Sequence, residues 1–572
     1  MDMMTRIAEK TAECISTLWP EAEGLPSAEE LRGLLAVPPD PALGDYAFPC
    51  FRLARPLRSA PPKIAESICA AWSASDLASV RPVNGYMNFF LNRENFAAET
   101  MAELEEKGER FGSSDEGKGK TICLDYSSIN IAKRFHIGHL STTMIGHSLK
   151  RIYDFLGYAT VGINHLGDWG TQFGKMVCAY VKWGNKEDVE ARGIDAMTEL
   201  YVRFHREAET DPSLEDEGRA WFKKIEDNDP EAMEIFRWFK EVTLKDAARV
   251  YDKLGVTFDS YAGESFYNDK MEPVVRELRD KGLLTESQGA QVVNLEEDNM
   301  PPCLILKSDG ATIYATRDLA AAIYRQNTYH FHKCLYVVAY QQDLHFRQVF
   351  RVLEKMGYPW AKDCVHVAFG MVSFEGEALS TRKGNMILLD DLLDQAVAKA
   401  REIIEQKSPN LENKDEVARQ IGIGAVIYTD LSNNRIKDID FRWDNALNFD
   451  GESGPYVQYT HARCCSVLRK APDFGGAVPD WSALTDDEAQ ALLRLISRFP
   501  DVIRDAADKY EPSMVTRAVT DIAQAYNKYY YEHRILDGEP AQAAARVALT
   551  RAVARVIKTG LFLIGIEAPE RM

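Results

Sequence analysis

The 572-residue sequence lacks the features that mark a membrane or a repeat protein. It has no apolar run long enough to cross a bilayer, because Lys, Arg or Asp interrupts its richest helical stretches, and it shows no signal peptide. No internal repeat or low-complexity segment is found either. We therefore expect a cytoplasmic protein that binds no membrane.

Cysteine pairs are also missing. The ten cysteines include no C-x-x-C pair, so neither a zinc-ligand framework nor a disulfide pattern is indicated. Cys464 and Cys465 are adjacent and would form a poor bridge. We expect reduced core cysteines and no zinc.

The chain has no excess of positive charge, since its formal net charge is −19. Such a charge repels polyanions on average, but the acidic residues are concentrated between positions 198 and 241, where a solvated helical face is expected. Near the C-terminus, Arg551, Arg555 and Lys558 recur at helical spacing. They fit either a solvated face or a track along a phosphate backbone, so a nucleic-acid partner is not excluded.

The length exceeds what one hydrophobic core serves and predicts several domains. Residues 1–117 look like a small α+β domain whose end contains a Gly-, Ser- and Lys-rich linker. Residues 118–445 alternate strand-like and helix-like runs, with an acidic helical insertion at about 180–262. Residues 446–572 show helices only. The predicted fold class is multidomain α/β: a doubly wound, Rossmann-like parallel sheet with flanking α+β and all-helical domains.

The most informative stretch is His136-Ile137-Gly138-His139. It follows a short apolar run at 121–125 and a loop, opens a helix-like run to 156, and precedes a second strand-like run at 159–164. This is the βαβ unit of a doubly wound sheet, in which ligands bind beyond the carboxyl ends of the strands. Two imidazoles at a helix opening suit phosphate oxygens, although surface histidines at a helix cap are the plain alternative.

Further matches extend along the whole chain. They are DYSSINIAKRFHIGHLSTTMIG at 125–146, NHLGDWGTQFGK at 164–175, YATRDLA at 314–320, YQQDLHFRQV at 340–349, LSTRKGN at 379–385, GPYVQYTHAR at 454–463 and the closing APERM. In this order they closely resemble arginyl-tRNA synthetase, a class I aminoacyl-tRNA synthetase.

The resemblance implies a two-step reaction. The carboxylate of L-arginine attacks the α-phosphate of ATP to give arginyl-adenylate, and the arginyl group passes to the 3′-terminal adenosine of tRNA(Arg). Mg²⁺ is expected with ATP, held by phosphate oxygens and water, so no protein metal ligand is named. Members of this family commonly need tRNA for arginine activation, and we expect the same here. We also expect a monomer.

For the ATP site, the resemblance assigns charge stabilisation to His136 and His139, with Gly138 allowing close approach of the nucleotide. The usual Lys-Met-Ser-Lys loop is replaced by Ala378 to Thr381 and lacks both lysines. Lys133, three residues before His136, is expected to supply the missing charge as a catalytic group. The other implied ATP contacts are Gly167, Asp168, Ser380, Arg382 and Lys383. Two departures from the family, Arg134 for proline and Ser141 for a frequent basic residue, delete no catalytic group.

For arginine, a planar five-donor guanidinium calls for carboxylate acceptors. The resemblance places Asp125 and Asp318 in that role, with Tyr314 on the same helix face as Asp318. The resemblance also assigns Ser127 to the arginine pocket, and it assigns Asn130 and Gln342 to the backbone end of the amino acid. Such a pocket rejects lysine without editing, so the insertion is expected to be structural or tRNA-facing.

For tRNA, the N-terminal domain resembles one that contacts the tRNA elbow, through Tyr86 or Asn88. The C-terminal domain resembles an anticodon-binding one. Its expected contacts are Tyr456, Gln458, Tyr459, His461 and Arg463, where aromatic and basic groups interleave.

Other interpretations remain open. A glutamyl- or cysteinyl-type class I enzyme would have a different pocket, and the cysteinyl type would carry zinc-ligand cysteines. A small nucleotidyltransferase would lack the helical C-terminal domain. A noncatalytic RNA-binding paralogue would keep the fold, but here both histidines, Lys133 and the arginine pocket are present together.

Overall fold

The computed structural model describes residues 3–378 and 387–572. The chain divides into two compact units. One comprises residues 1–111, 464–499 and 524–556, and the other comprises 112–463, 500–523 and 557–572. The helices from Gly454 onward contribute segments to both units: α18 (Gly454–Lys470), α19 (Asp487–Asp508), α20 (Ser513–Glu532) and α21 (Pro540–Leu563). No strand occurs in residues 446–572, all of which are described, as the sequence predicts.

The first unit contains a three-stranded antiparallel sheet in the order β1-β3-β2. Phe48 of β1 lies opposite Met87 of β3 in the register, and both side chains are fully buried. Asn92 caps the helix that follows the sheet. The strands and helices of this part of the chain are β1 (Tyr46–Pro49), β2 (Ala78–Val83), β3 (Tyr86–Leu91), α1 (Met3–Leu18), α2 (Ala28–Leu34), α3 (Ala54–Leu57), α4 (Pro61–Ala71) and α5 (Arg93–Lys107).

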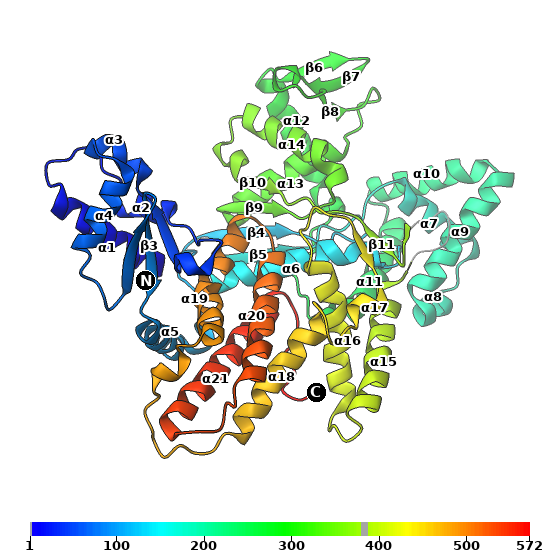
Figure 1. Ribbon diagram of the computed structural model, residues 1–572. Helices are drawn as coiled ribbons and strands as arrows, with labels where there is room; N and C mark the ends of the chain where they lie inside the picture. The colour runs from blue at the N-terminus through cyan, green and yellow to red at the C-terminus, as the bar shows by residue number, and fades with distance from the viewer. Residues whose placement is uncertain (1–2, 379–386) are drawn as a thin grey trace. The chain divides into compact units, whose positions relative to one another are not determined.

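The second unit is organised around a parallel sheet in the order β10-β9-β4-β5 (Figure 1). Its strands are β4 (Thr121–Asp125), β5 (Ala159–Ile163), β9 (Lys333–Tyr336) and β10 (Cys364–His366). Ile122, Cys123 and Leu124 of central β4 are fully buried, as expected for a strand covered on both faces. Helix α6 (Leu140–Phe155) covers one face, whereas α13 (Tyr314–Tyr329) and α14 (Asp343–Lys355) cover the other.

The sheet strands are shorter than the apolar runs of the sequence. The run at 334–339 continues past β9: Val337 N makes a last ladder bond to the carbonyl of Asp125 in β4, but the carbonyl of Val337 accepts from Thr142 Oγ1 and not from a strand. The run at 364–369 likewise leaves β10, and Ala339 and Phe369 pair only as an isolated bridge. The chain thus turns out of the sheet at its carboxyl edge, where the βαβ pattern predicts a site.

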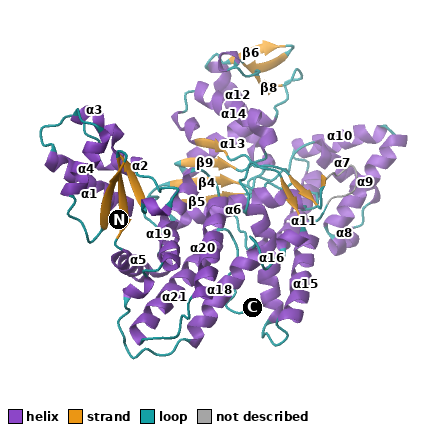
Figure 2. Ribbon diagram, in the orientation of Figure 1, coloured by secondary structure: helices purple, strands orange, loops and turns teal. Residues whose placement is uncertain are grey.

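The insertion is all-helical, as predicted (Figure 2). The bounds of its last helix, α11, follow from the residues at its two ends. The side chain of Asp229 accepts from Ala232 N, and Pro230 stands at the first helical position. Gly255 ends the helix with φ of 66°. The helices are α7 (Thr171–Trp183), α8 (Lys186–Arg192), α9 (Ile194–Thr210), α10 (Ser213–Glu226) and α11 (Pro230–Leu254).

Two small sheets complete the second unit, in the orders β6-β7-β8 and β12-β11-β13. The first shares a hydrophobic core with α12, α13 and α14. The remaining elements are α12 (Met271–Asp280), β6 (Leu284–Ser287), β7 (Ala290–Val293), β8 (Cys303–Leu306), β11 (Val372–Phe374), β12 (Glu377–Ala378), α15 (Leu389–Lys407), α16 (Lys414–Leu431), β13 (Ile439–Phe441) and α17 (Trp443–Ala446).

Candidate active site

The two histidines form a reciprocally hydrogen-bonded turn. Gly138 N donates to His136 Nδ1 at 3.1 Å, and His136 N donates to His139 Nδ1 at 3.3 Å. Residues Ile137–His139 form a 3₁₀ turn that leads directly into α6. Each imidazole therefore accepts a backbone N–H of this turn, and these two hydrogen bonds fix both rings at the amino end of the helix.

This geometry determines the protonation of both rings. Because Nδ1 of His136 accepts the N–H of Gly138, its neutral tautomer carries the proton on Nε2, whereas Nδ1 of His139 lies 3.3 Å from both the N–H and the carbonyl of His136. Burial lowers the pKa of His136 to about 4, with a further contribution from the charge of Lys133, and burial lowers the pKa of His139 to about 3. At neutral pH the turn thus presents two uncharged imidazoles, with an Nε2–H donor on His136.

Gly138 and Gly167 are sites of close approach. A Cβ at Gly138 would lie 2.9 Å from the ring of His136, so glycine is required for the histidine turn itself, in addition to any nucleotide. A Cβ at Gly167 would lie 2.2 Å from Asn130 Oδ1. Asn130 and Gly167 form an isolated parallel bridge, which ties the loop before the histidines to the segment after β5.

The loop between β4 and the histidines holds three non-glycine residues in the left-handed region. The φ values are 70° at Ser127, 46° at Ser128 and 59° at Ala132. Each such residue costs about 1–3 kcal/mol and persists only where its surroundings enforce it. Here Ser127 N donates to Thr142 Oγ1 and Ala132 N to Thr243 Oγ1. The loop is therefore locked in shape from α6 and α11.

The predicted basic residues before the histidines differ in their surroundings. Lys133 is exposed, and its charge acts on both imidazoles. Arg134 forms an ion pair with Asp195 of α9, so its charge is directed to the insertion.

The Ser141 departure is linked to a buried carboxyl group. Ser141 Oγ donates to Asp430 Oδ1 at 2.5 Å, while Asp430 Oδ2 is buried and has no hydrogen-bond partner among the described residues. Burial raises the pKa of Asp430 to about 7, and the serine bond lowers it only in part. The start of α6 is thereby joined to α16.

Ser380, Arg382 and Lys383 lie outside the described residues. The flanking chain does reach the histidine turn: Ile137 N donates to the carbonyl of Ile387 at 3.0 Å, and Leu389 N donates to the carbonyl of Phe135 at 3.0 Å. The segment that carries the three predicted ATP contacts therefore rejoins the described chain beside His136.

An acidic cluster lies after β5 and at the start of α13. His345 Nε2 lies 2.6 Å from Asp318 Oδ2. Burial alone would raise the pKa of Asp318, but the hydrogen bond and charge of His345 hold it below its ordinary value. Tyr314, one turn earlier, is 69% exposed, and Gln342 is also exposed.

Glu264 belongs to the same cluster and was missed in the sequence. It feels the charges of Asp318 and Asp168, and its nearest cation is Arg317 at 3.8 Å. Burial is the main cause that raises the pKa of Glu264 to about 7. The carboxyl group thus lacks a full counter-charge. No motif spacing marks it, and the one available signal is its position just after the insertion, where Ser260 returns to pair with Ile163 of β5.

Asp125 is engaged by the protein itself. Arg325 Nη2 donates to Asp125 Oδ2 at 2.7 Å, and Ser128 Oγ donates to Asp125 Oδ1 at 2.8 Å. Arg325 and Asp125 are both buried. A substrate guanidinium at Asp125 would compete with an internal one.

Ser127 and Asp168 are also held by protein partners. The hydroxyl of Ser127 bonds with Tyr251 and Thr143, at 2.8 and 2.9 Å. Asp168 is fully buried and accepts from Lys240 Nζ and from the backbone and hydroxyl of Ser265. These two predicted ligands therefore shape the site from behind its surface.

Comparisons with known proteins cover the full chain. A family model described as the catalytic domain of class I tRNA synthetases (R) matches residues 101–443. Models for an arginyl tRNA synthetase N-terminal domain and a DALR anticodon-binding domain match residues 5–91 and 457–572. The arginine–tRNA ligase of Alkaliphilus metalliredigens is 52% identical over 573 residues, with both chains covered completely.

The chain belongs to the arginyl-tRNA synthetase family. A second curated relative, the arginine–tRNA ligase of Clostridium beijerinckii, is 53% identical over 95% of this chain and 97% of its own. In fold, the chain is similar to the arginyl-tRNA synthetases of Thermus thermophilus and Plasmodium falciparum. Their TM-scores are 0.82 and 0.80, their identities 24% and 22%, and at least 99% of each chain is covered. The predicted family, fold class and enzyme class are confirmed.

In this arginyl-tRNA synthetase, the predicted tRNA-facing residues of α18 separate into two groups. Tyr459 is 41% exposed, with the guanidinium of Arg463 above its ring at 4.9 Å, and Tyr456 is partly exposed. Gln458 and His461 are buried instead: Gln458 Nε2 donates to the carbonyl of Glu567, and His461 Nδ1 lies 2.9 Å from that of Pro569. These two side chains hold the C-terminal segment.

The two N-terminal candidates also differ. Tyr86 is 42% exposed and packs edge-on against Phe51. Asn88 is 3% exposed and lies within the sheet. In the C-terminal helices, Arg555 Nη1 donates to the carbonyl of Leu104, so its guanidinium is used within the first unit.

Two general findings concern metals and membranes. Among the described residues, one group of three side chains has metal-ligand spacing, Asp486, Glu488 and His533, in the first unit and not among the catalytic candidates. None of the helices in residues 3–378 and 387–572 combines the length and apolar character required to traverse a bilayer.

Proposed function

We propose that this arginyl-tRNA synthetase activates L-arginine with ATP and transfers it to the 3′-terminal adenosine of tRNA(Arg) through the residues assembled at the carboxyl edge of the parallel sheet. One observation carries the residue assignment. The Asn130–Gly167 bridge joins the loop of the histidine donors to the segment that holds the acidic cluster. Phosphate donors and guanidinium acceptors thus share one rigid framework.

The triphosphate is bound by the histidine turn. The imidazoles of His136 and His139 donate to it, Gly138 permits their packing, and Lys133 supplies positive charge. Negative charge rises on the phosphates as the arginine carboxylate attacks, so preorganised donors lower the barrier. We assign Ser380, Arg382 and Lys383 to the same phosphates, supported by the contacts of Ile387 and Leu389 with the histidine turn.

The guanidinium of arginine is bound by Glu264 and Asp318, with Tyr314 beside them. A cation entering the cluster would supply the counter-charge that Glu264 lacks. Asn130 and Gln342 hold the backbone end of the amino acid. We assign Asp125, Ser127 and Asp168 to supporting roles, because protein donors already occupy their oxygens; Gly167 borders the ATP side.

Mg²⁺ enters with ATP. The described groups nearest the proposed phosphates are N–H donors and a lysine, which suits an ion held by phosphate oxygens and water. When bound, Mg²⁺ neutralises phosphate charge. The protein residues orient the triphosphate and the attacking carboxylate.

The tRNA contacts are proposed from exposure and chemistry. Tyr456, Tyr459 and Arg463 present aromatic and cationic groups for unpaired anticodon bases, and Tyr86 does so for the elbow. We propose 1–117, 118–445 and 446–572 as elbow-contacting, catalytic and anticodon-binding domains, with a structural or tRNA-facing insertion. We further propose a cytoplasmic monomer that needs tRNA for arginine activation.

ATP–pyrophosphate exchange with each amino acid, with and without tRNA, tests the activity. We expect exchange with arginine alone among the amino acids, and only when tRNA is present. Exchange with another amino acid, or none with arginine plus tRNA, would contradict the assignment. Full exchange without tRNA would remove the tRNA requirement only.

A further inference from the structure

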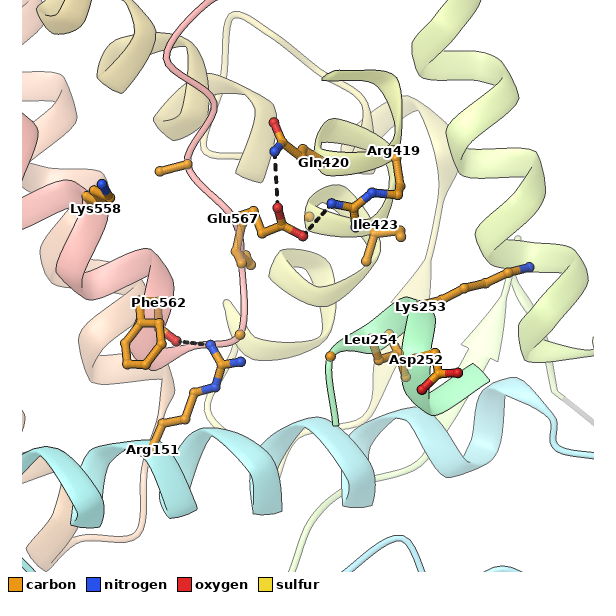
Figure 3. A pocket seen from close by; sticks show the side chains of 15 residues that line it. Arg151, Asp252, Lys253, Leu254, Arg419, Gln420, Ile423, Lys558, Phe562 and Glu567 are labelled. Atoms are coloured by element: carbon orange, nitrogen blue, oxygen red, sulfur yellow. Dashed lines mark hydrogen bonds and ion pairs between the residues drawn. The ribbon is translucent and has the colours of Figure 1, made fainter. Parts of the chain in front are cut away.

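A cavity of about 470 Å³ lies in the second unit, lined by none of the residues assigned above (Figure 3). Its walls come from α6, the end of α11, α16, the end of α21 and the segment 565–568. This volume lies within the range of about 300–1,000 Å³ that is typical of small-molecule sites. The cavity wall holds four cations and two carboxylates: Arg151, Lys253, Arg419, Lys558, Asp252 and Glu567.

Two of the four cations are neutralised. Lys253 Nζ lies within 2.6 Å of carboxylate oxygens of Asp390 and Asp394. Arg419 pairs with Glu416 and, at 2.7 Å, with Glu567. Glu567 also accepts from Gln420, so each of its two oxygens has a protein donor, as Figure 3 shows. The positive charges of Lys253 and Arg419 are therefore balanced by carboxylates of the protein.

Arg151 forms no ion pair with a carboxylate among the described residues, although the charge of Glu567 acts on it. Its Nη1 donates to the carbonyl of Phe562 at 2.7 Å, and its guanidinium lies over the Phe562 ring at 4.5 Å. A guanidinium keeps its charge in proteins, and a partly buried one that lacks an anion is costly. Its remaining donors match an oxyanion in fork geometry.

Lys558 stands one turn before Phe562 on the same face of α21. It is exposed, and no described residue forms a hydrogen bond or an ion pair with it. Arg151 and Lys558 therefore add to the cavity wall two cations that form no ion pair among the described residues. Phe562 is itself 52% exposed.

A third polar group lies behind this end. His147, one turn before Arg151 on α6, is 5% exposed, and neither ring nitrogen has a hydrogen-bond partner. It lies against Gly565 of the cavity wall, where a Cβ would be 3.5 Å from His147 Cδ2. Unsatisfied buried polar groups of this kind are rare in folded proteins, so His147 calls for a partner that the described side chains do not supply.

We propose that this cavity binds a free phosphate ester of about mononucleotide size, with its phosphate between Arg151 and Lys558. The exposed ring of Phe562 and the side chains of Leu254 and Ile423 supply apolar surface for the organic part. A free ligand is favoured over the backbone of tRNA because the site is concave and enclosed by five segments, whereas backbone contacts follow open grooves.

The test uses the full chain and adenosine 5′-monophosphate in isothermal titration calorimetry. His136→Ala with His139→Ala removes the proposed phosphate donors of the active site, so remaining binding reports a second site. In that background, Lys558→Gln and Arg151→Lys are each expected to weaken binding at least about tenfold. Lys150→Gln is the matched control on α6, because Lys150 faces Asp154 and Asp259.

The outcomes separate this site from the active site. Loss of all binding in the histidine variant, or unchanged affinity in Lys558→Gln, would refute the proposal. Lys558→Gln changes an exposed side chain and keeps the fold testable. A reduced affinity for tRNA in Lys558→Gln with unchanged nucleotide binding would also overturn it, since it would assign the cations to the tRNA backbone.

Discussion

Asp125 and Asp318 are both acidic residues at the carboxyl edge of the parallel sheet, yet the protein uses them differently. Asp125 is buried against Arg325, an internal guanidinium. Asp318 is partnered by His345 and adjoins Glu264, whose pKa is raised to about 7. The contrast teaches that an acidic residue in a site binds a cationic substrate only where the fold has left its charge unmatched. The charge of Asp125 is matched by Arg325 at 2.7 Å, whereas Glu264 has only the 3.8 Å contact with Arg317.

The strongest test of this contrast is the removal of charge at Asp318. We expect Asp318→Asn to lower kcat/KM for arginine by about 10⁴-fold, because a buried acceptor for the guanidinium is lost. The KM for ATP should change little. Steady-state charging assays with Asp280→Asn, an exposed site, as control measure this; an unchanged KM for arginine in Asp318→Asn would refute its role.

The opposite side of the contrast is the Asp125–Arg325 pair. Arg325→Met should lower the free energy of unfolding by about 3–5 kcal/mol, because it leaves a buried carboxylate without its cation. Adding Asp125→Asn should recover most of that loss. Denaturant unfolding of both variants measures it, and a double variant no more stable than the single one would contradict the pairing argument.

Asp430 extends the comparison to a buried carboxyl group with no cation. Its pKa in the folded protein, about 7, lies above its ordinary value, so the folded state holds the proton more tightly. Its contribution to stability is full below about pH 4 and is lost as the pH rises through about 7. Asp430→Asn should therefore be more stable than the parent by about 4 kcal/mol near pH 8, and equal near pH 4. Thermal unfolding across pH checks this, and a pH-independent difference would contradict it.

The raised pKa of Glu264 predicts that arginine binding depends on pH. Below about pH 7 its carboxyl group is protonated and cannot accept the guanidinium fully, so the KM for arginine should fall about tenfold between about pH 6 and pH 8. Glu264→Gln should raise that KM and abolish its pH dependence. The KM for ATP at each pH is the internal control. A pH dependence kept in Glu264→Gln would assign the titration to another group.

Much of the architecture was predictable because it depends on local patterns. The run at 121–125 became β4, the helical spacing after His139 became α6, and residues 446–572 contain helices without a strand. The carboxyl edge of the sheet followed from the βαβ order. Strand ends were less predictable: after a last ladder bond to Asp125, the carbonyl of Val337 accepts from the hydroxyl of Thr142, which is distant in sequence.

The sequence predicted which residues form the candidate site only where those residues belong to a recognisable motif. Gln458 and His461 matched a pattern for nucleic-acid contact, but their partners are the carbonyls of Glu567 and Pro569. Glu264 matched no pattern, since one carboxylate after an insertion resembles any surface acid. Sequence spacing specifies which residues are present and leaves their partners undetermined.

By itself, the sequence determined the family, the parallel sheet and the position of the histidines at its carboxyl edge, because these depend on order and periodicity along the chain. Only the tertiary structure decided which charges are matched. The guanidinium that meets Asp125 comes from α13, and the hydroxyl near Asp430 comes from α6. Charge and burial depend on groups brought together in space, so the difference between a structural acid and a substrate-binding one exists only in the folded chain.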